Sequence, residues 1–279
     1  MFLRGFKHLV NFSLLTLLIV SLSGCRGQST AKNSTSASQS QQKTVKPLKK
    51  AKKSPYATWH HEKTVKLPIL MYHSISSGNA LKVPASEFKA QMAYLKQQHY
   101  RTLTTTEAVY ALSHHRLPQS KVVWVTLDDS YTDNKTAAWP ILKTNHQHAT
   151  INFITGFATH HNHLSLADAQ QMKASGAIDF QSHTVRHLDL NELTDQQQLT
   201  ELTTSKHWLD QNLHQNTAVI CYPAGRANQA TVKAAKQAGY QYALSTAPGI
   251  ATSQEPAYNL TRQRVTPGMS LATFASLLH

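Results

Sequence analysis

The spacing of hydrophobic residues divides the chain into three segments. Residues 1–25 contain an apolar stretch, Leu9–Val20, preceded by two basic residues. Residues 26–65 are rich in Ser, Thr, Gln and Lys and hold few apolar side chains. From residue 66 to residue 279, short apolar runs alternate with amphipathic stretches, which predicts a single folded domain.

Within residues 66–279 the apolar runs are typical of buried strands, and the stretches between them are typical of helices. The expected strands are Pro68–Tyr72, Arg101–Leu103, Val122–Leu127, Thr150–Ile154, Ile178–Phe180, Ala218–Tyr222 and Gln241–Leu244. Helix starts are expected at Ser86, Thr104, Thr194 and Asn228, and a helix end at Gly239. About seven βα units predict an α/β fold with a parallel sheet, either open or closed into a barrel. In a barrel, chemistry gathers at the carboxyl ends of the strands.

The first 25 residues are typical of a targeting segment. Their apolar stretch is too short to span a bilayer comfortably as a permanent helix. It ends in Leu22-Ser23-Gly24-Cys25, which resembles the lipobox of bacterial lipoproteins, where the Cys25 thiol would carry a lipid anchor. The alternative is an ordinary secretory signal that happens to contain a cysteine. If Cys25 is lipidated, Cys221 has no disulfide partner and is expected to be a buried, inert thiol.

The formal net charge of +14 is concentrated before the folded domain. Between Arg26 and Lys66 there are ten basic residues and one acid, whereas sixteen basic and thirteen acidic residues follow from Leu67 onward. The excess therefore belongs to a solvated tether, which argues against nucleic acid as a partner. The lysines of the tether could also touch anionic lipid or teichoic-type polymers.

Two polar motifs follow predicted strands. Asp128 and Asp129 end the strand Val122–Leu127, and adjacent buried carboxylates need partners such as a metal ion. The alternative is a helix cap. His183 and His187 follow another strand and lie four residues apart, so both rings can reach one ion if the segment is helical. One Asp and two His make a divalent-metal ligand set with open positions. Each motif alone is weak, since about one such His pair is expected by chance among seventeen histidines.

Two further strand ends carry candidate residues. His73 closes the first expected strand, although a single His at a strand end is more often structural. Cys221-Tyr222-Pro223-Ala224-Gly225-Arg226 forms a tight turn after a later strand, where Pro and Gly could serve the turn alone.

Taken in order, these motifs resemble those of the polysaccharide deacetylases, carbohydrate esterase family 4 with its NodB homology domain. The matching segments are Pro68–His73, Thr126-Leu127-Asp128-Asp129, His183-Thr184-x-x-His187, Tyr222-Pro223-Ala224-Gly225, and a tail around Arg264-Val265 and Leu271–Leu278. The opening segment is similar to the branch that deacetylates poly-β-1,6-N-acetylglucosamine, in which the motif order is rearranged and the acid His lies near the start.

This resemblance implies a distorted (β/α) barrel with about seven parallel strands and a bound divalent metal ion, zinc being the expected ion. Its ligands would be Asp129, His183 and His187. Asp128 would be the general base and His73 the acid that protonates the leaving amine, while the backbone N–H of Ala224 would hold the oxyanion. Tyr72, Tyr131 and Tyr222 are candidate substrate contacts.

Three positions depart from the family pattern. Ser130 stands where a Gly is usual, so the turn must tolerate a side chain. Ala224 stands where a Tyr is common, which removes an aromatic sugar contact but keeps the backbone donor. Cys221 stands where many members carry the Arg that steadies the base, and Arg264 or Arg226 would have to replace it.

The sequence therefore favours a monomeric, extracytoplasmic, membrane-anchored deacetylase of an N-acetylated polysaccharide, with poly-β-1,6-N-acetylglucosamine ahead of peptidoglycan. One alternative is a catalytically silent glycan-binding lipoprotein, but no catalytic or ligand side chain is missing. The other is a metal-scavenging lipoprotein, suggested by the clusters His60-His61, His114-His115 and His160-His161-x-His163. Those clusters lie in the expected tether or in expected loops, where we expect no acidic partners nearby, and we interpret them as surface residues.

Overall fold

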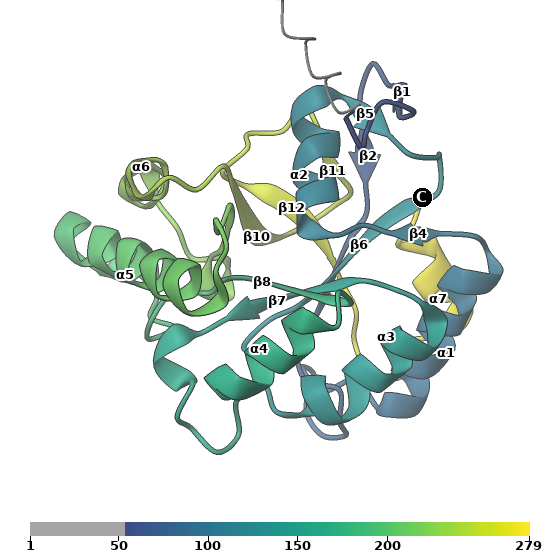
Figure 1. The fold of residues 1–279 in the computed structure, drawn as a ribbon, viewed down its shortest axis with the longest axis horizontal. Helices are drawn as coiled ribbons and strands as arrows, with labels where there is room; N and C mark the ends of the chain where they lie inside the picture. The colour runs from purple at the N-terminus through teal and green to yellow at the C-terminus, as the bar shows by residue number, and fades with distance from the viewer. Residues whose placement is uncertain (1–53) are drawn as a thin grey trace, which may run out of the picture. The chain divides into compact units, whose positions relative to one another are not determined.

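The computed structural model describes residues 54–279, in which seven parallel strands close into a barrel (Figure 1). Around the barrel the strands are β3 (Ile69–Tyr72), β12 (Leu260–Arg264), β10 (Tyr242–Pro248), β9 (Val219–Cys221), β8 (Ile178–Ser182), β7 (Ala149–Phe153) and β6 (Val122–Leu127). Pairing of β3 with β6 closes the ring, so the expected barrel is confirmed and the open sheet is excluded. The leader, Cys25 and residues 26–53 of the expected tether lie outside the described residues.

The barrel is irregular on one side. Strands β8 and β9 share a single residue pair, Ser182 with Ile220, and the register of β10 against β12 shifts between Leu244 and Pro248. A short strand β4 (Arg101–Thr102) extends the sheet beside β6, outside the closed ring. The remaining strands are short antiparallel pairs, β1 (His60–His61) with β5 (Arg116–Leu117) and β2 (Lys66–Leu67) with β11 (Ala251–Thr252).

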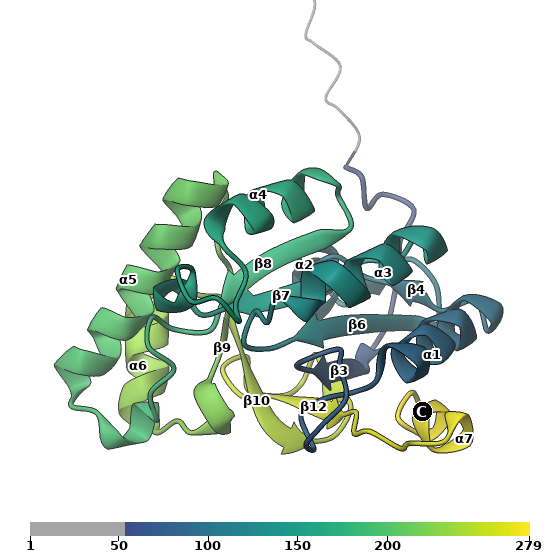
Figure 2. The same cartoon turned by 90° about the horizontal axis from the view of Figure 1, so that it is seen from below.

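Helices cover the outside of the barrel (Figure 2). They are α1 (Ala85–Gln97), α2 (Thr105–His114), α3 (Trp139–Asn145), α4 (Leu166–Ala174), α5 (Asp195–Leu213), α6 (Gln229–Ala238) and α7 (Leu271–Ser276), with a π-helical turn η1 (Asn134–Ala138) and 3₁₀ turns η2 (Thr155–Phe157), η3 (Leu190–Glu192) and η4 (Pro223–Gly225). Helices α1, α3 and α7 gather on one side, and α5 and α6 pack together on the other. Among residues 54–279, no helix combines the length and apolar character needed to cross a membrane.

The predicted strands are apolar because both of their faces are buried, one in the barrel and one under the helices. All six residues of β6 are buried, and so are all five of β7. The sequence did not predict β12, because Leu260–Arg264 reads Leu-Thr-Arg-Gln-Arg and lacks an apolar run. Its central residue Arg262 is nevertheless fully buried. A charged side chain takes an interior position there, which a hydrophobic pattern does not reveal.

Most helix ends follow the expected local chemistry. Thr104, Thr194 and Asn228 each accept a hydrogen bond from the backbone N–H three residues on, in complete capping boxes. Gly239 ends α6 in the left-handed conformation, with φ of 86°. The start expected at Ser86 is wrong: α1 begins at Ala85 after Pro84, and no side chain caps it.

The folded region begins earlier than predicted, because residues 54–65 pack on the domain instead of continuing the tether. Trp59 is 5% exposed and Val65 is fully buried. Tyr56 stacks on Tyr110 of α2, with ring centroids 3.9 Å apart. These apolar residues are isolated in a polar segment, so no periodic pattern marked them.

We expect Trp59→Ala to lower the free energy of unfolding by about 3 kcal/mol, because it removes a large aromatic side chain from a packed cluster. Urea unfolding of the full chain, followed by circular dichroism, measures the change. His60→Ala is the matched control: its side chain is 46% exposed, and we expect a change below about 0.5 kcal/mol. Equal effects of the two substitutions would show that residues 54–65 do not stabilise the domain.

Candidate active site

Four strands bring the candidate residues to one edge of the barrel. Strands β3, β6, β8 and β9 are parallel members of the closed ring, so their carboxyl ends lie on the same edge. His73 follows β3, and Asp128 and Asp129 follow β6. His183 follows β8, and the turn that contains Ala224 follows β9. Residues spread over 150 positions of the sequence thus become neighbours through topology.

Asp129, His183 and His187 converge with one ligand atom each, all within 4.8 Å of one another. The Nε2 atoms of both histidines lie 3.3 Å from Oδ1 of Asp129. That oxygen is buried and has no hydrogen-bond partner among the described residues. A buried carboxylate oxygen without a partner is costly unless a cation binds it. Two imidazole nitrogens and one carboxylate oxygen therefore fit a divalent metal ion.

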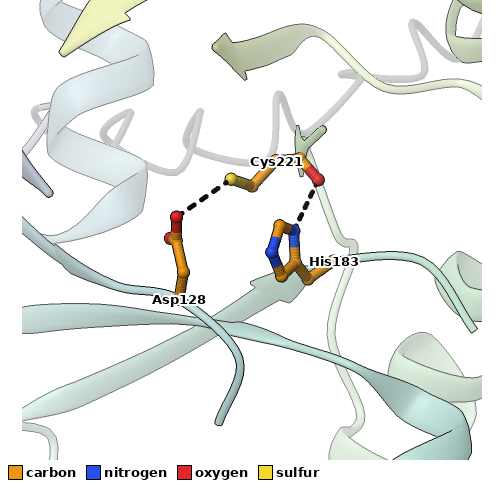
Figure 3. Close-up of side chains that lie close together, drawn as sticks. All are labelled: Asp128, His183 and Cys221. Atoms are coloured by element: carbon orange, nitrogen blue, oxygen red, sulfur yellow. Dashed lines mark hydrogen bonds between the residues drawn. The ribbon is translucent and has the colours of Figure 1, made fainter. Parts of the chain in front are cut away.

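A hydrogen bond to a backbone carbonyl orients His183 for metal binding. Its Nδ1 atom lies 2.7 Å from the carbonyl oxygen of Cys221, to which it can only donate (Figure 3). The neutral ring then carries its lone pair on Nε2, the atom that faces Asp129. The backbone N–H of His187 donates to Thr184 Oγ1 at 3.1 Å, which holds the segment between the two histidines.

Asp128 is held by an arginine inside the barrel. Arg262 donates from Nη1 to Oδ1 at 2.9 Å and from Nη2 to Oδ2 at 2.8 Å, and Asn152 donates to Oδ1 at 2.7 Å. Arg262 also donates from Nε to the backbone carbonyl of Ser245 at 2.7 Å. Burial alone would raise the pKa of Asp128, but the charge and hydrogen bonds of Arg262 outweigh it and hold that pKa well below its ordinary value. Asp128 is therefore an ionised, oriented carboxylate.

Cys221 lies against this pair. Its Sγ accepts from Arg262 Nη2 at 3.2 Å and is 3.6 Å from Asp128 Oδ2, to which it donates (Figure 3). Asp128, His183 and Cys221 form a second group with ligand-type atoms within 4.8 Å. However, Arg262 and Asn152 already use the oxygens of Asp128, and burial raises the pKa of the Cys221 thiol. The Asp129 group is therefore the better candidate metal centre, and Cys221 remains a buried thiol as expected.

The arginine beside the base is neither of the two expected from the sequence. Arg264 is the last residue of β12, and it is exposed. The side chain of Arg226 is 58% exposed and pairs with Asp189. Both predictions are wrong, and Arg262 takes the role. Strand periodicity places Arg262 and Arg264 on the same side of β12, so only their depth in the barrel distinguishes them, and the sequence does not give that depth.

His73 also lies close to Asp128. Its side chain is 13% exposed, and its Nε2 is 3.9 Å from Asp128 Oδ2. Burial lowers the pKa of His73 by more than the nearby carboxylates raise it. Asn134, at the start of η1, donates to the backbone carbonyl of His73 at 2.9 Å and so anchors the end of β3.

The turn after β9 presents a backbone amide. Ala224 is exposed and has φ of 50°, and Gly225 has φ of 70°. A Cβ on Gly225 would come within 2.2 Å of Thr246 Oγ1, so glycine is required there. Thr246 Oγ1 donates to the carbonyl of Ala224 at 3.3 Å and thereby helps to fix the orientation of the turn.

Two of the three candidate tyrosines cannot offer a ring to a sugar. Tyr72 is fully buried and donates to Gln91 Oε1 at 2.8 Å. Tyr222 is 1% exposed and packs in the cluster under α6. Those two predictions are wrong, because both side chains fill the core. Tyr131 is half-buried, and burial followed by the charge of Asp129 raises its pKa to about 12.

Three residues were not expected near the site from the sequence. Arg262 and Asn152 hold Asp128, as described above. His163, expected at the surface, is part-buried; its Nδ1 lies 2.8 Å from the carbonyl oxygen of Asp129, and its ring stacks on Tyr131. No periodicity or motif marked them, since each acts through a contact between distant segments. The cluster at His60 is exposed as expected, although it has an acidic neighbour: His60 Nε2 is 3.3 Å from Glu62 Oε1.

Comparisons with known proteins agree on the family. Residues 115–243 match the family model of polysaccharide deacetylases. A Bacillus subtilis protein named "Putative polysaccharide deacetylase YxkH" is 45% identical over 239 residues, which cover 84% of this chain and 85% of that protein. The poly-β-1,6-N-acetyl-D-glucosamine N-deacetylase of Staphylococcus epidermidis is 29% identical over 78% of this chain and 81% of its own length. The solved structure of the Streptococcus pyogenes deacetylase PplD in complex with acetate is 37% identical, covers 77% of this chain and 99% of that chain, and superposes with a TM-score of 0.74.

The chain belongs to the polysaccharide deacetylase family. It is accordingly a hydrolase that acts on carbon–nitrogen bonds other than peptide bonds, with the distorted barrel typical of the NodB type. Deacetylases of this family depend on a metal ion, and the group of Asp129, His183 and His187 is where this chain could hold one.

Replacing Arg262 tests the buried ion pair. We expect Arg262→Met to lower the free energy of unfolding by about 3–5 kcal/mol, because it leaves the Asp128 carboxylate buried without its counter-charge. Arg264→Met removes an equal charge two residues away, and we expect a change below about 0.5 kcal/mol. Chemical unfolding of both variants measures the difference. Equal stability of the two variants would contradict a role for Arg262 in holding Asp128.

Replacing Ser130 tests the strained turn after the two carboxylates. Ser130 has φ of 56°, and its buried Oγ has no partner among the described residues. We expect Ser130→Gly to raise the free energy of unfolding by about 1 kcal/mol, because glycine adopts positive φ without steric cost and removes the unpaired hydroxyl. Thermal unfolding measures the change, with Ser130→Ala as the control that removes the hydroxyl but keeps the Cβ. A stability of Ser130→Gly at or below that of Ser130→Ala would contradict backbone strain.

Proposed function

We propose that this protein hydrolyses the N-acetyl amides of an N-acetylglucosamine-containing extracellular or cell-wall polysaccharide. The observation that carries the proposal is the pair of adjacent carboxylates in two different environments. Asp128 is held by hydrogen bonds from Arg262 and Asn152, whereas the Oδ1 atom of Asp129 lacks a partner among the described residues and faces two imidazoles. One carboxylate is suited to proton transfer, and the other to holding a cation.

An amide resists hydrolysis because its carbonyl is stabilised by resonance and its amine leaves poorly. A divalent ion held by Asp129, His183 and His187 would supply Lewis-acid chemistry at the amide carbonyl and lower the pKa of an attacking water. Asp128 accepts the proton of that water as the new C–O bond forms. Arg262 keeps Asp128 ionised and fixes the direction of its oxygens, as a general base requires.

His73 completes the proton transfer. Its Nε2 lies 3.9 Å from Asp128 Oδ2, and His73 would protonate the nitrogen as the C–N bond breaks. The backbone N–H of Ala224, an exposed residue in a left-handed turn, donates to the developing oxyanion, and a donor of this kind contributes about 3 kcal/mol. The products are acetate and the free amino sugar. A glycan-binding protein without activity would not need an oriented base and a proton donor beside the metal ligands.

Poly-β-1,6-N-acetylglucosamine and peptidoglycan are the two polymers to consider. The name of the Staphylococcus epidermidis relative and the opening segment Pro68–His73 support the first. We also propose that the protein acts as a monomer outside the cytoplasm, anchored to the cell membrane through Cys25 and the tether. The leader and the composition of residues 26–65 support this location.

Separating the base from the metal ligands tests the mechanism. We expect Asp128→Asn to lower acetate release from N-acetylglucosamine oligomers by at least about 10³-fold, while the metal content measured by atomic emission stays unchanged. His183→Ala should lower both acetate release and metal content, because it removes a ligand.

The exposed residue Arg264 provides the control, since Arg264→Met should keep both the metal and the turnover. Full turnover by Asp128→Asn would contradict the assignment of the base. Full metal content in His183→Ala would contradict the assignment of the ligands.

A further inference from the structure

A polar hollow lies beside the catalytic groups, where the loop after β3 meets the segment after β6. Its volume is about 510 Å³. Hydroxyl, amide and charged side chains line it, among them Ser74, Thr132, Thr136, Asn162, Lys82 and Asp133. Ser74 directly follows His73, and Tyr131, which also lines the hollow, is separated from Asp129 by one residue. The hollow therefore adjoins the segments that carry the proposed acid and the metal ligand Asp129.

The backbone fixes Lys82 at the wall of the hollow. Lys82 pairs with Ser74 in a parallel bridge, and the N–H of Val83 donates to the carbonyl of Ser74 at 3.0 Å. The lysine side chain lies against Gly78: a Cβ at that glycine would be 2.7 Å from Cδ of Lys82 and 3.5 Å from its Nζ. The loop from His73 to Val83 therefore carries the proposed acid and Lys82 on one closed turn.

The ammonium group of Lys82 is not neutralised within residues 54–279. It makes no ion pair within 4.0 Å and no side-chain hydrogen bond there. Asp133 lines the same hollow, but its oxygens serve the loop: Oδ2 accepts from Ser74 Oγ at 2.5 Å, and Oδ1 accepts from the backbone N–H of Ile75 at 2.9 Å. A cation is thus presented among groups that bind sugar hydroxyls.

We propose that Lys82 binds an anionic substituent, a carboxylate or a phosphate group, on the sugar next to the one that is deacetylated. This inference rests on the proposed function and specifies the class of polymer that is the substrate. A charged glycan, such as the lactyl-bearing glycan of peptidoglycan, is expected to be a better substrate than a neutral N-acetylglucosamine polymer. A neutral polymer offers the Lys82 ammonium only hydroxyl and amide oxygens, whereas a carboxylate or phosphate adds the opposite charge.

The test uses the full chain and three N-acetylated oligosaccharides of equal length: one neutral, one with a free lactyl carboxylate, and one with a phosphate group. We expect kcat/KM to be about tenfold higher for one or both charged oligomers, mainly through KM, with the advantage shrinking as salt rises. Lys82→Met should remove this advantage and leave the neutral oligomer within twofold of wild type, whereas Lys82→Arg should keep it. Lys89→Met, an exposed lysine of α1 that does not line the hollow, is the matched control.

A direct binding measurement separates this inference from the proposed function. Calorimetric titration of the Asp128→Asn protein with the same oligomers reports affinity without turnover. The role of Lys82 is supported if the Asp128→Asn protein binds a charged oligomer more tightly than the neutral one and the Asp128→Asn/Lys82→Met protein does not. The charged oligomer that binds more tightly then shows whether the group bound is a carboxylate or a phosphate. Equal affinity for all three oligomers, or an equal loss for all three on Lys82→Met, overturns it. Absence of acetate from every oligomer would instead contradict the deacetylase proposal, while the titration would still decide the role of Lys82.

Discussion

The ion pair between Arg262 and Asp128 is the interaction on which the site depends. Both groups are buried inside the barrel, where an unpaired charge would be strongly destabilising. The pair is tolerated because both carboxylate oxygens have donors and the guanidinium also reaches the Ser245 carbonyl. It joins β12 to the end of β6 across the barrel interior, so the same contact stabilises the closed ring and orients the proposed base.

This pair also explains why two adjacent aspartates can differ in role. Asp128 points toward Arg262 and is held by its hydrogen bonds, whereas Asp129 turns away, toward the two histidines. The backbone makes the divergence possible, because Asp129 and Ser130 both adopt positive φ. Thr184 and His187 adopt positive φ as well, on the facing segment. Strained backbone is thus concentrated in the two segments that orient the side chains of the candidate site, and the surrounding barrel holds these segments in place.

The features predictable from the sequence are those that depend on neighbours along the chain. Strands with two buried faces produce apolar runs, and capping boxes at Thr104, Thr194 and Asn228 follow from residues three positions apart. Residues that follow apolar runs were correctly expected at one edge, because parallel strands share their direction.

Contacts between distant segments were not predictable. Arg262 lies in a polar strand, and its partner is 134 residues away. Trp59 is a single aromatic residue in a polar stretch, and it packs on a helix whose residues lie about 50 positions later. Tyr72 and Tyr222 were candidate substrate contacts because they belong to segments that resemble the family motifs. Successive side chains of a strand, however, point to opposite faces of the sheet. Cys221 faces Asp128 inside the barrel, so the next residue, Tyr222, faces the helical layer outside it.

The loop after β3 carries both His73, the proposed acid, and Lys82, the residue proposed to select the substrate. Asp133 holds Ser74 and Ile75, and Asn134 holds the carbonyl of His73, so the start of η1 fixes the loop that bears the proposed acid. Lys82 returns to the same point through its pairing with Ser74. A sugar substituent that binds Lys82 therefore acts on the element that positions His73. A substitution at Asp133 would then alter both the preference for the neighbouring sugar and the position of His73. It would do so although Asp133 makes no hydrogen bond to the metal ligands or to Asp128.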